Sequence, residues 1–305
     1  MPATKIPQTD ISNGLITATI YLPDKDKGYY RGTRVDWSGN ISRLEYKGHN
    51  YFGQWFSKYS PEIHDVIMGP VEEFTPLDYP DIKPGESFVK IGVGTVYKPD
   101  DRPYEFYRVY QLLNPGKWTV KKSRDKVLFI HDLEDKAYSY HYEKTVQLTA
   151  GKPELVLFHT LKNTGSRTIE TSVYDHNFFV IDKHPIGPGL VLKVPFNLRG
   201  EGVGFGEIAE IQGNQISYLR PIGNGEEAEC YDLKGYGTGA EDYDIRIENR
   251  ITGAGVRITC DQPLLKLAFW SCPTTMCPEP YIKIKAEPGK EMSWTIRYEF
   301  YTLNK

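Results

Sequence analysis

The sequence predicts an all-β protein, built as one large antiparallel β-sandwich. Aromatic residues make up 13% of the chain, and its 28 glycines and 21 prolines recur between short apolar runs. Strands favour aromatic and β-branched residues, whereas glycine and proline mark the turns between strands. Helical periodicity is almost absent, and no internal repeat or linker-like change of composition divides the chain. We therefore expect residues 1–305 to form a single sandwich domain.

Alternation of apolar and polar residues predicts individual strands, because successive side chains of a strand point to opposite faces. The pattern is clearest over residues 292–300, which follow a Pro-Gly turn at 288–289. We expect residues 251–259 and 264–270 to form a pair joined around a turn at 261–263. Further strands are expected over residues 155–161 and 168–179, with a turn at 163–166 between them.

Charge and hydropathy exclude two classes of partner. The formal net charge is -3, and the lysines and arginines are scattered, so neither a nucleic-acid surface nor a membrane-binding patch is predicted. No apolar stretch approaches the length needed to span a membrane. Residues 1–10 are polar and contain two prolines, unlike a signal peptide or anchor. A cytoplasmic protein is expected, unless a leader peptide precedes this sequence in the natural protein.

The four cysteines do not predict a metal site. Cys272 and Cys277 lie close together, but Cys230 and Cys260 do not make the second close pair that a typical zinc site requires. Reduced, partly buried thiols are expected. A disulfide between Cys272 and Cys277 is the alternative for an oxidising compartment.

A histidine at the end of an expected strand is a candidate catalytic residue. His176 shares a strand face with Tyr174 and Phe178, and the earlier positions of that face are polar. A concave face that binds a ligand would have this composition, and its histidine could exchange protons with the ligand. The alternative is a structural histidine bonded to a neighbouring strand.

A carboxylate with a restricted backbone is the second candidate. Glu279 lies between Pro278 and Pro280. Each proline fixes its own φ, and Pro280 also restricts Glu279, so this side chain is held with little backbone freedom. Such placement suits a general base. The alternative is a glutamate in a proline-rich surface loop.

Several short motifs resemble the aldose 1-epimerase, or galactose mutarotase-like, superfamily, which includes hexose-6-phosphate epimerases. In order along the chain they are Asp175-His176-Asn177-Phe178-Phe179, Ile251-Thr252-Gly253-Ala254-Gly255-Val256, Asp261-Gln262-Pro263, Phe269-Trp270 and Cys277-Pro278-Glu279-Pro280. The first is similar to the family segment Asn-His-x-Tyr-Phe, which carries the catalytic histidine, and the last to the segment that carries the catalytic glutamate. The resemblance implies the family's β-supersandwich and a cofactor-independent isomerase acting at the anomeric carbon of a small-molecule carbohydrate.

The resemblance also implies a role for each candidate. Glu279 would be the general base that takes the proton from the anomeric hydroxyl, and His176 the general acid that protonates the ring oxygen. His176 would then have to arrive protonated, which a nearby carboxylate such as Glu279 favours. We expect the two side chains to face each other across a cleft, with room for one sugar ring between them.

The chain departs from the family pattern in its first half. Typical members carry a second active-site histidine and an arginine there, but the segment Pro84–Lys90 has Glu86 in place of the histidine and Lys90 in place of the arginine. His64 lies nearby in sequence, at a spacing that does not match. We expect Glu73 and Lys90 to contact the substrate. The missing histidine favours the alternative function, a carbohydrate-binding protein of the same fold without turnover.

Two arginines and an aspartate complete the expected substrate-binding residues. Arg31 and Arg34 lie among tyrosines and a tryptophan, so they could clamp an anionic sugar; alternatively, they pair with nearby carboxylates. Asp242 or Asp244 falls where the family places a substrate-binding aspartate, and Asp242 is our prediction. Convergence of Arg31, Arg34 and Lys90 in one cleft would favour a sugar phosphate or uronate, whereas their exposure to solvent would favour a neutral sugar. The sequence does not predict the oligomeric state.

Overall fold

The computed structural model describes residues 6–303, which form 22 strands and three short 3-10 helices. The predicted all-β fold with large antiparallel sheets is confirmed. The N-terminal residues 1–5, part of the segment that predicted a cytoplasmic location, and the last two residues of the predicted domain lie outside the described residues. No helix in the described range is long and apolar enough to cross a membrane.

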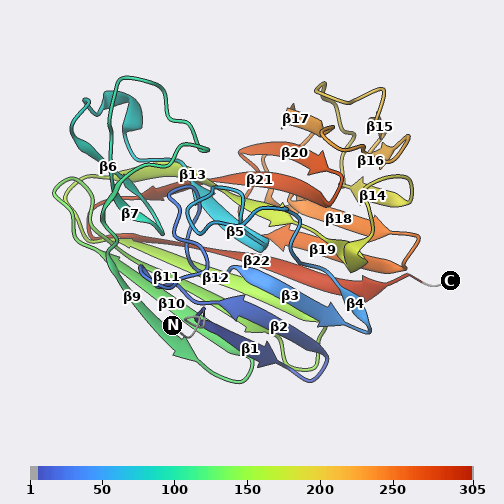
Figure 1. Ribbon diagram of the computed structural model, residues 1–305, viewed down its shortest axis with the longest axis horizontal. Helices are drawn as coiled ribbons and strands as arrows, with labels where there is room; N and C mark the ends of the chain where they lie inside the picture. Colours follow the sequence, from blue (N-terminus) through green and yellow to red (C-terminus); the bar gives the residue numbers. More distant parts are fainter. Residues whose placement is uncertain (1–5, 304–305) are drawn as a thin grey trace.

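A large sheet of ten strands forms one layer of the molecule (Figure 1). Its neighbouring strands pair antiparallel throughout. In spatial order they are β15 (Ala209–Gln212), β16 (Gln215–Tyr218), β14 (Leu190–Lys193), β18 (Asp244–Asn249), β19 (Ala254–Cys260), β22 (Glu291–Thr302), β12 (Glu154–Asn163), β11 (Tyr140–Leu148), β10 (Lys126–Leu133) and β9 (Lys117–Lys122).

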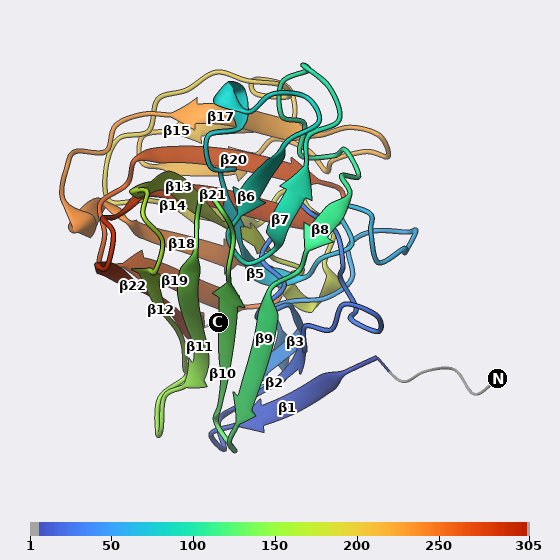
Figure 2. The same cartoon turned by 90° about the vertical axis from the view of Figure 1, so that its left-hand side faces the viewer.

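A second, five-stranded sheet lies over the large one, as Figures 1 and 2 show from two sides. Its order is β17 (Ala228–Leu233), β20 (Lys266–Cys272), β21 (Thr275–Ala286), β13 (Ile169–Phe178) and β5 (Gly69–Phe74). The smaller sheets comprise β1 (Gln8–Ser12), β2 (Ile16–Tyr21), β3 (Ile41–Tyr46) and β4 (His49–Asn50), and β6 (Ser87–Lys90), β7 (Gly94–Tyr97) and β8 (Leu112–Asn114). The 3-10 helices are η1 (Tyr79–Asp81), η2 (Ile181–Lys183) and η3 (Ala240–Asp242).

The main core fills the space between the two large layers. On β22, Trp294, Ile296, Tyr298 and Phe300 are buried, whereas the polar residues between them are exposed or half-buried. This confirms the alternation read from the sequence, and it fixes the register of β22, because a slip by one residue would turn the apolar set outwards. Strands β12 and β13 confirm the two strands expected on either side of the turn at 163–166.

One predicted strand pair is wrong. β19 pairs with β18 and β22 in the large sheet, whereas β20 pairs with β17 and β21 in the five-stranded sheet. The chain therefore crosses from one layer to the other around residues 261–265, and 251–253 belong to the preceding turn. Alternation predicts a strand but not its partner, and in a sandwich a corner between sheets has the same polar and proline-containing sequence as a hairpin turn.

Strand β13 contributes to both the core and a pocket, because its alternate residues face opposite ways. Asp175 and Asn177 point towards the large sheet, where the hydroxyl of Tyr298 on β22 is within hydrogen-bonding distance of both side chains. His176 and Phe178 point to the opposite face and line a pocket. The parity argument made from the sequence is confirmed. All four cysteines are free thiols.

Candidate active site

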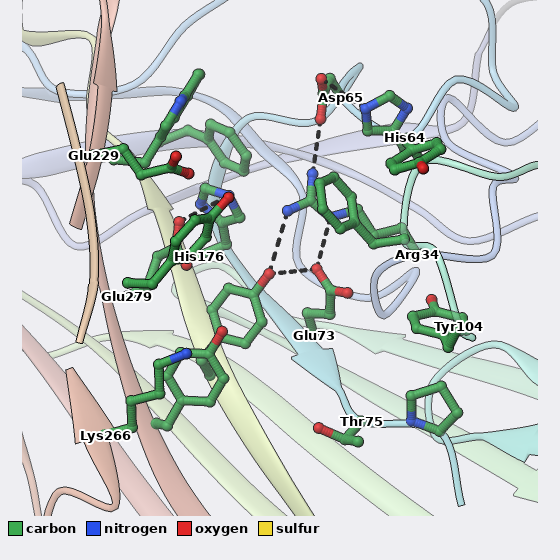
Figure 3. Close-up of a pocket in the computed structure, with 18 of the residues that line it drawn as sticks. Arg34, His64, Asp65, Glu73, Thr75, Tyr104, His176, Glu229, Lys266 and Glu279 are labelled. Atoms are coloured by element: carbon green, nitrogen blue, oxygen red, sulfur yellow. Dashed lines mark hydrogen bonds and ion pairs between the residues drawn. The ribbon is translucent and has the colours of Figure 1, made fainter. Parts of the chain in front are cut away.

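His176 and Glu279 lie in contact at one side of this pocket (Figure 3). The Nε2 atom of His176 is 3.4 Å from Oε1 of Glu279, and the two residues are 3% and 8% exposed. The expected juxtaposition is therefore present, but the expectation of a sugar ring between the two side chains is wrong. A distance of 3.4 Å leaves no space between them, so a sugar would have to lie over the pair.

The prolines beside Glu279 explain how β21 holds it. Glu279 belongs to a strand, not to the surface loop considered as the alternative. The backbone ladder between β13 and β21 ends before this position, and Pro278 and Pro280 have no N–H to continue it. Asn177 replaces the missing bonds: its Nδ2 donates to the carbonyl of Pro278 at 3.1 Å, and its Oδ1 accepts from Tyr298 at 2.7 Å. This buried crosslink fixes β21 against β13, which sets the spacing of the His176–Glu279 pair.

Burial favours the neutral form of both members of this pair. Burial, with a smaller effect of the Arg34 charge, lowers the pKa of His176 well below its ordinary value. Burial also raises the pKa of Glu279 to about 8, and Arg34 opposes this shift only in part. Both shifts run against the expectation that Glu279 keeps His176 protonated, because burial favours a neutral imidazole beside a protonated carboxyl group.

Stability is expected to reflect this raised pKa. A carboxyl group whose pKa is higher in the folded state binds its proton more tightly there, so its contribution to stability falls as pH rises from its ordinary pKa of 4.5 to about 8. Glu279→Gln removes this titration. We therefore predict that the unfolding temperature of the variant rises relative to that of the wild type as pH is raised from about 5 to about 8. Calorimetric scans of both proteins across that range measure the difference, and a difference independent of pH would contradict the assignment.

Arg34 joins the segment that carries Asp65 to strands β5 and β13. Its Nε donates to Glu73 at 2.6 Å, its NH1 to Asp65 at 2.7 Å and its NH2 to the hydroxyl of Tyr174 at 3.2 Å. Tyr174 in turn donates to Glu73 at 2.5 Å. Burial would raise the pKa of Glu73, but the charges of Arg34 and Lys90 lower it, so Glu73 is a carboxylate. The guanidinium is thus already paired with two carboxylates.

The pocket has a volume of about 500 Å³ and combines aromatic with charged side chains. Its aromatic walls include Phe106, Tyr107, Phe178, Tyr231, Trp270 and Tyr281. His176 stacks on Phe178 at 3.9 Å between ring centroids, and Trp270 meets the His176 ring edge-on at 6.4 Å. Aromatic faces with a few polar groups between them are typical of small-molecule sites. Within residues 6–303, no group of three or more His, Cys, Asp and Glu side chains is placed to hold a metal ion.

Two of the five expected substrate-binding residues line this pocket, namely Arg34 and Glu73. Lys90 lies behind it: Lys90 is 0% exposed, donates to the hydroxyl of Tyr104 at 2.5 Å and is 3.4 Å from Glu73. The prediction of direct substrate contact is therefore wrong for Lys90, because its ammonium group is buried and already paired with Tyr104 and Glu73.

Arg31 and Asp242 also lie outside the pocket. Arg31 donates to the carbonyl of Asp26 and borders a separate hollow with Glu62. Asp242, in η3, accepts from the backbone N–H of Gly237 at 2.5 Å. These two predictions are wrong because sequence spacing alone did not show which way each loop folds. The three cations thus do not converge in one cleft.

Several pocket residues were not predicted as site residues. His64, set aside because its spacing did not match the family, lines the pocket next to Asp65, whose carboxylate is 2.9 Å from its Nε2. Lys266 and Trp270 come from β20, which pairs with β21, and Glu229 comes from β17, which pairs with β20. Trp270 belongs to the Phe269-Trp270 motif, but nothing in the sequence pattern showed that these three side chains line one pocket with Glu279.

The residue before Glu73 belongs to a different charged group, inside the core. Glu72 is 1% exposed, and its Oε1 is 2.6 Å from Nε2 of His159. Lys144, which is 0% exposed, donates to the other carboxylate oxygen and to the carbonyl of Ser38 at 3.2 Å. Burial would raise the pKa of Glu72, but Lys144 and His159 lower it to about 2. Strand β5 therefore carries one paired carboxylate on each face.

Comparison with known proteins supports the fold. No family model and no curated protein match the sequence. Among solved structures, a Synechocystis sp. PCC 6803 protein is 12% identical with a TM-score of 0.60, over 99% of this chain and 98% of its own. A galactose mutarotase-like protein from Clostridium acetobutylicum is 15% identical with a TM-score of 0.55 (99% and 100% covered), and an aldose epimerase homologue from C. elegans is 11% identical with a TM-score of 0.55 (98% and 100%). The chain has the galactose mutarotase-like fold, as the sequence motifs predicted.

Proposed function

We propose that this protein is a sugar isomerase that interconverts the α and β anomers of an uncharged aldose by opening and reclosing the ring. The observation that carries the proposal is the contact between His176 and Glu279 at one side of an aromatic pocket. Opening a sugar ring at its anomeric carbon requires one group that accepts a proton and one that donates a proton. A buried histidine and carboxyl group that together hold one proton meet this requirement.

The proposed reaction leaves the proton count of the pair unchanged. A proton moves from Glu279 to His176 across the 3.4 Å contact, which makes Glu279 a base and His176 an acid. Glu279 then takes the proton of the anomeric hydroxyl while His176 protonates the ring oxygen, and the C1–O5 bond breaks to give the open-chain aldehyde. Rotation about the C1–C2 bond and reclosure on the other face of the carbonyl give the second anomer. No cofactor is needed, because the sugar is neither oxidised nor reduced.

The charges of the pocket favour a neutral sugar over a phosphorylated or acidic one. Among the described residues, five carboxyl side chains and two cationic ones line the pocket. Arg34 is paired with Glu73 and Asp65, and Lys266 packs over the ring of Tyr281 at 4.8 Å. An anionic substrate would therefore enter a field of like charge and would compete with Glu73 for Arg34.

Exchange spectroscopy of anomeric protons tests this function. The protein is added to a neutral aldose, to the corresponding uronate and to the corresponding 6-phosphate, and the α/β exchange rate is compared with that in buffer. We expect acceleration of about tenfold or more for the neutral sugar and a smaller effect for the anions. The surface variant Glu170→Gln is a control and should behave as the wild type. Acceleration confined to an anionic sugar would overturn the assignment of a neutral substrate, and none for any sugar would overturn the isomerase.

One observation favours a second candidate, a carbohydrate-binding protein without turnover. The position that resembles the second family histidine holds Glu86, which lies outside the pocket. His64 lines the pocket from a different segment, so the family's acid–base groups are only partly reproduced. Binding of a sugar without accelerated exchange would support this candidate.

A further inference from the structure

The pocket continues outwards into a group of three aromatic side chains, of which two are exposed and one, that of His64, is half-buried. His64, Phe106 and Tyr107, here called the aromatic rim, contact one another: the ring centroid of Phe106 is 5.6 Å from that of His64 and 5.4 Å from that of Tyr107, and His64 and Tyr107 are 6.4 Å apart. All three side chains line the pocket.

Arg34 links the aromatic rim to the buried part of the pocket through direct contacts. The guanidinium carbon lies 4.3 Å from the ring centroid of Phe106, and Asp65 joins the same guanidinium to His64. Exposure increases along this path, from 6% at Arg34 to 40% at Phe106 and 55% at Tyr107. The aromatic surface therefore leads continuously from the buried floor to solvent.

Adjacent exposed aromatic rings that adjoin a pocket indicate a ligand-binding surface, because contiguous exposed apolar patches, unlike single exposed apolar side chains, mark interaction sites. The volume of about 500 Å³ falls within the range of about 300–1,000 Å³ that holds drug-sized ligands, which are larger than a single sugar ring. The pocket thus has space and apolar surface beyond what one pyranose placed over His176 and Glu279 would fill.

We propose that the substrate is the reducing end of an oligosaccharide, with the second sugar ring stacked on Phe106 and Tyr107. The inference rests on the proposed function, which places the anomeric carbon at the His176–Glu279 pair. Figure 3 shows this pair on one side of the pocket and His64, Asp65 and Arg34 on the other. In a pyranose ring, C4 lies opposite C1, so a glycosidic bond at O4 directs the second ring towards the rim.

The polar atoms of the rim suit a sugar better than an apolar ligand. The apolar C–H face of a pyranose packs on aromatic rings, while its hydroxyl groups need partners at the edge. The hydroxyl of Tyr107, bonded to Glu105 at 2.9 Å, and the half-exposed His64–Asp65 pair supply such partners. A second uncharged ring is also compatible with the excess of carboxylates in the pocket.

The test compares matched sugars that differ only by the added ring. Exchange spectroscopy gives kcat/KM for D-glucose and maltose, and for D-galactose and 4-O-galactosyl-galactose, and isothermal titration calorimetry gives the affinity for each. We expect the disaccharide to exceed its monosaccharide by about tenfold in one pair, and Tyr107→Ala to remove most of this ratio. Tyr107→Phe, which keeps the aromatic face, should retain it. Phe158→Ala, at a side chain that is 39% exposed on β12 and outside the pocket, is the matched control.

The outcomes separate this inference from the function on which it rests. Equal or faster exchange of the monosaccharides, with a ratio that Tyr107→Ala does not change, would overturn the inference and leave the isomerase standing. If no sugar is isomerised, the proposed isomerase function is overturned, and the measured affinities test the second sugar site on their own. Tighter binding of the disaccharide that depends on Tyr107 then supports the rim as that site. Equal affinities, or no binding, overturn it.

Discussion

Glu279→Gln is expected to lower the rate of anomer exchange by a factor of about 10²–10⁴, the range that general acid–base catalysis contributes. Glutamine has nearly the same shape as glutamic acid, so the variant keeps the contact with His176 but can no longer give up or accept the reacting proton. The exchange rate of the neutral sugar, measured by NMR at saturating concentration, reports the loss. Affinity for the sugar should change much less, because the amide retains hydrogen-bonding groups.

The control for this prediction is stability. Burial raises the pKa of Glu279 to about 8 and so favours its protonated form at neutral pH, which a neutral isostere replaces without loss of a buried charge. Thermal unfolding of the variant should therefore occur at or above the wild-type temperature. A large loss of stability together with the loss of activity would indicate a structural role for Glu279.

Glu72→Gln is expected to produce the largest change in stability, a loss of about 3–5 kcal/mol in the free energy of unfolding. The substitution removes the charge that pairs with Lys144, whose ammonium group has no access to solvent. Removing one partner of a buried ion pair leaves the other charge desolvated and uncompensated. Urea titration followed by tryptophan fluorescence measures the difference between variant and wild type.

Two further variants make this second prediction specific. The double variant Glu72→Gln with Lys144→Met removes both charges and should recover part of the stability, because an apolar side chain does not suffer the desolvation penalty of an ammonium. Glu170→Gln breaks an ion pair with Lys283 that is about half exposed on both sides and should leave the unfolding midpoint nearly unchanged. A double variant less stable than Glu72→Gln would contradict the account.

Alternation, which is a local property, was sufficient to predict five of the 22 strands of the described range and the face of His176. The residues from Met292 to Phe300 and the parity of His176 could be read in this way, and the prolines around Glu279 indicated its restrained position. Pairing between strands could not be read, since β19 and β20 are adjacent in sequence but belong to different sheets. Partners across a sandwich depend on contacts between distant segments.

The substrate-binding residues were harder to predict for the same reason. Arg34 and Arg31 are three residues apart, yet one turns into the pocket and the other borders a different hollow. Lys90 lies near the site, but its ammonium group is paired with Glu73 and Tyr104. The protonation of His176 was predicted wrongly because the sequence shows a neighbouring carboxylate but not the burial that outweighs it.

In strands β5, β13 and β21, residues that line the pocket are adjacent to residues that hold the sheets together. Glu73, His176 and Glu279 face the pocket, while their neighbours Glu72 and Asn177 hold the interior together. A mutation that shifts any of these strands would disturb both faces at once, so the reacting groups are difficult to change during evolution. The irregular segments 60–65 and 104–109, which carry His64 and Phe106, consist of exposed and half-buried residues and have no such double duty. Descendants of one ancestral protein could therefore acquire new sugar preferences by varying these segments while inheriting the same acid–base pair.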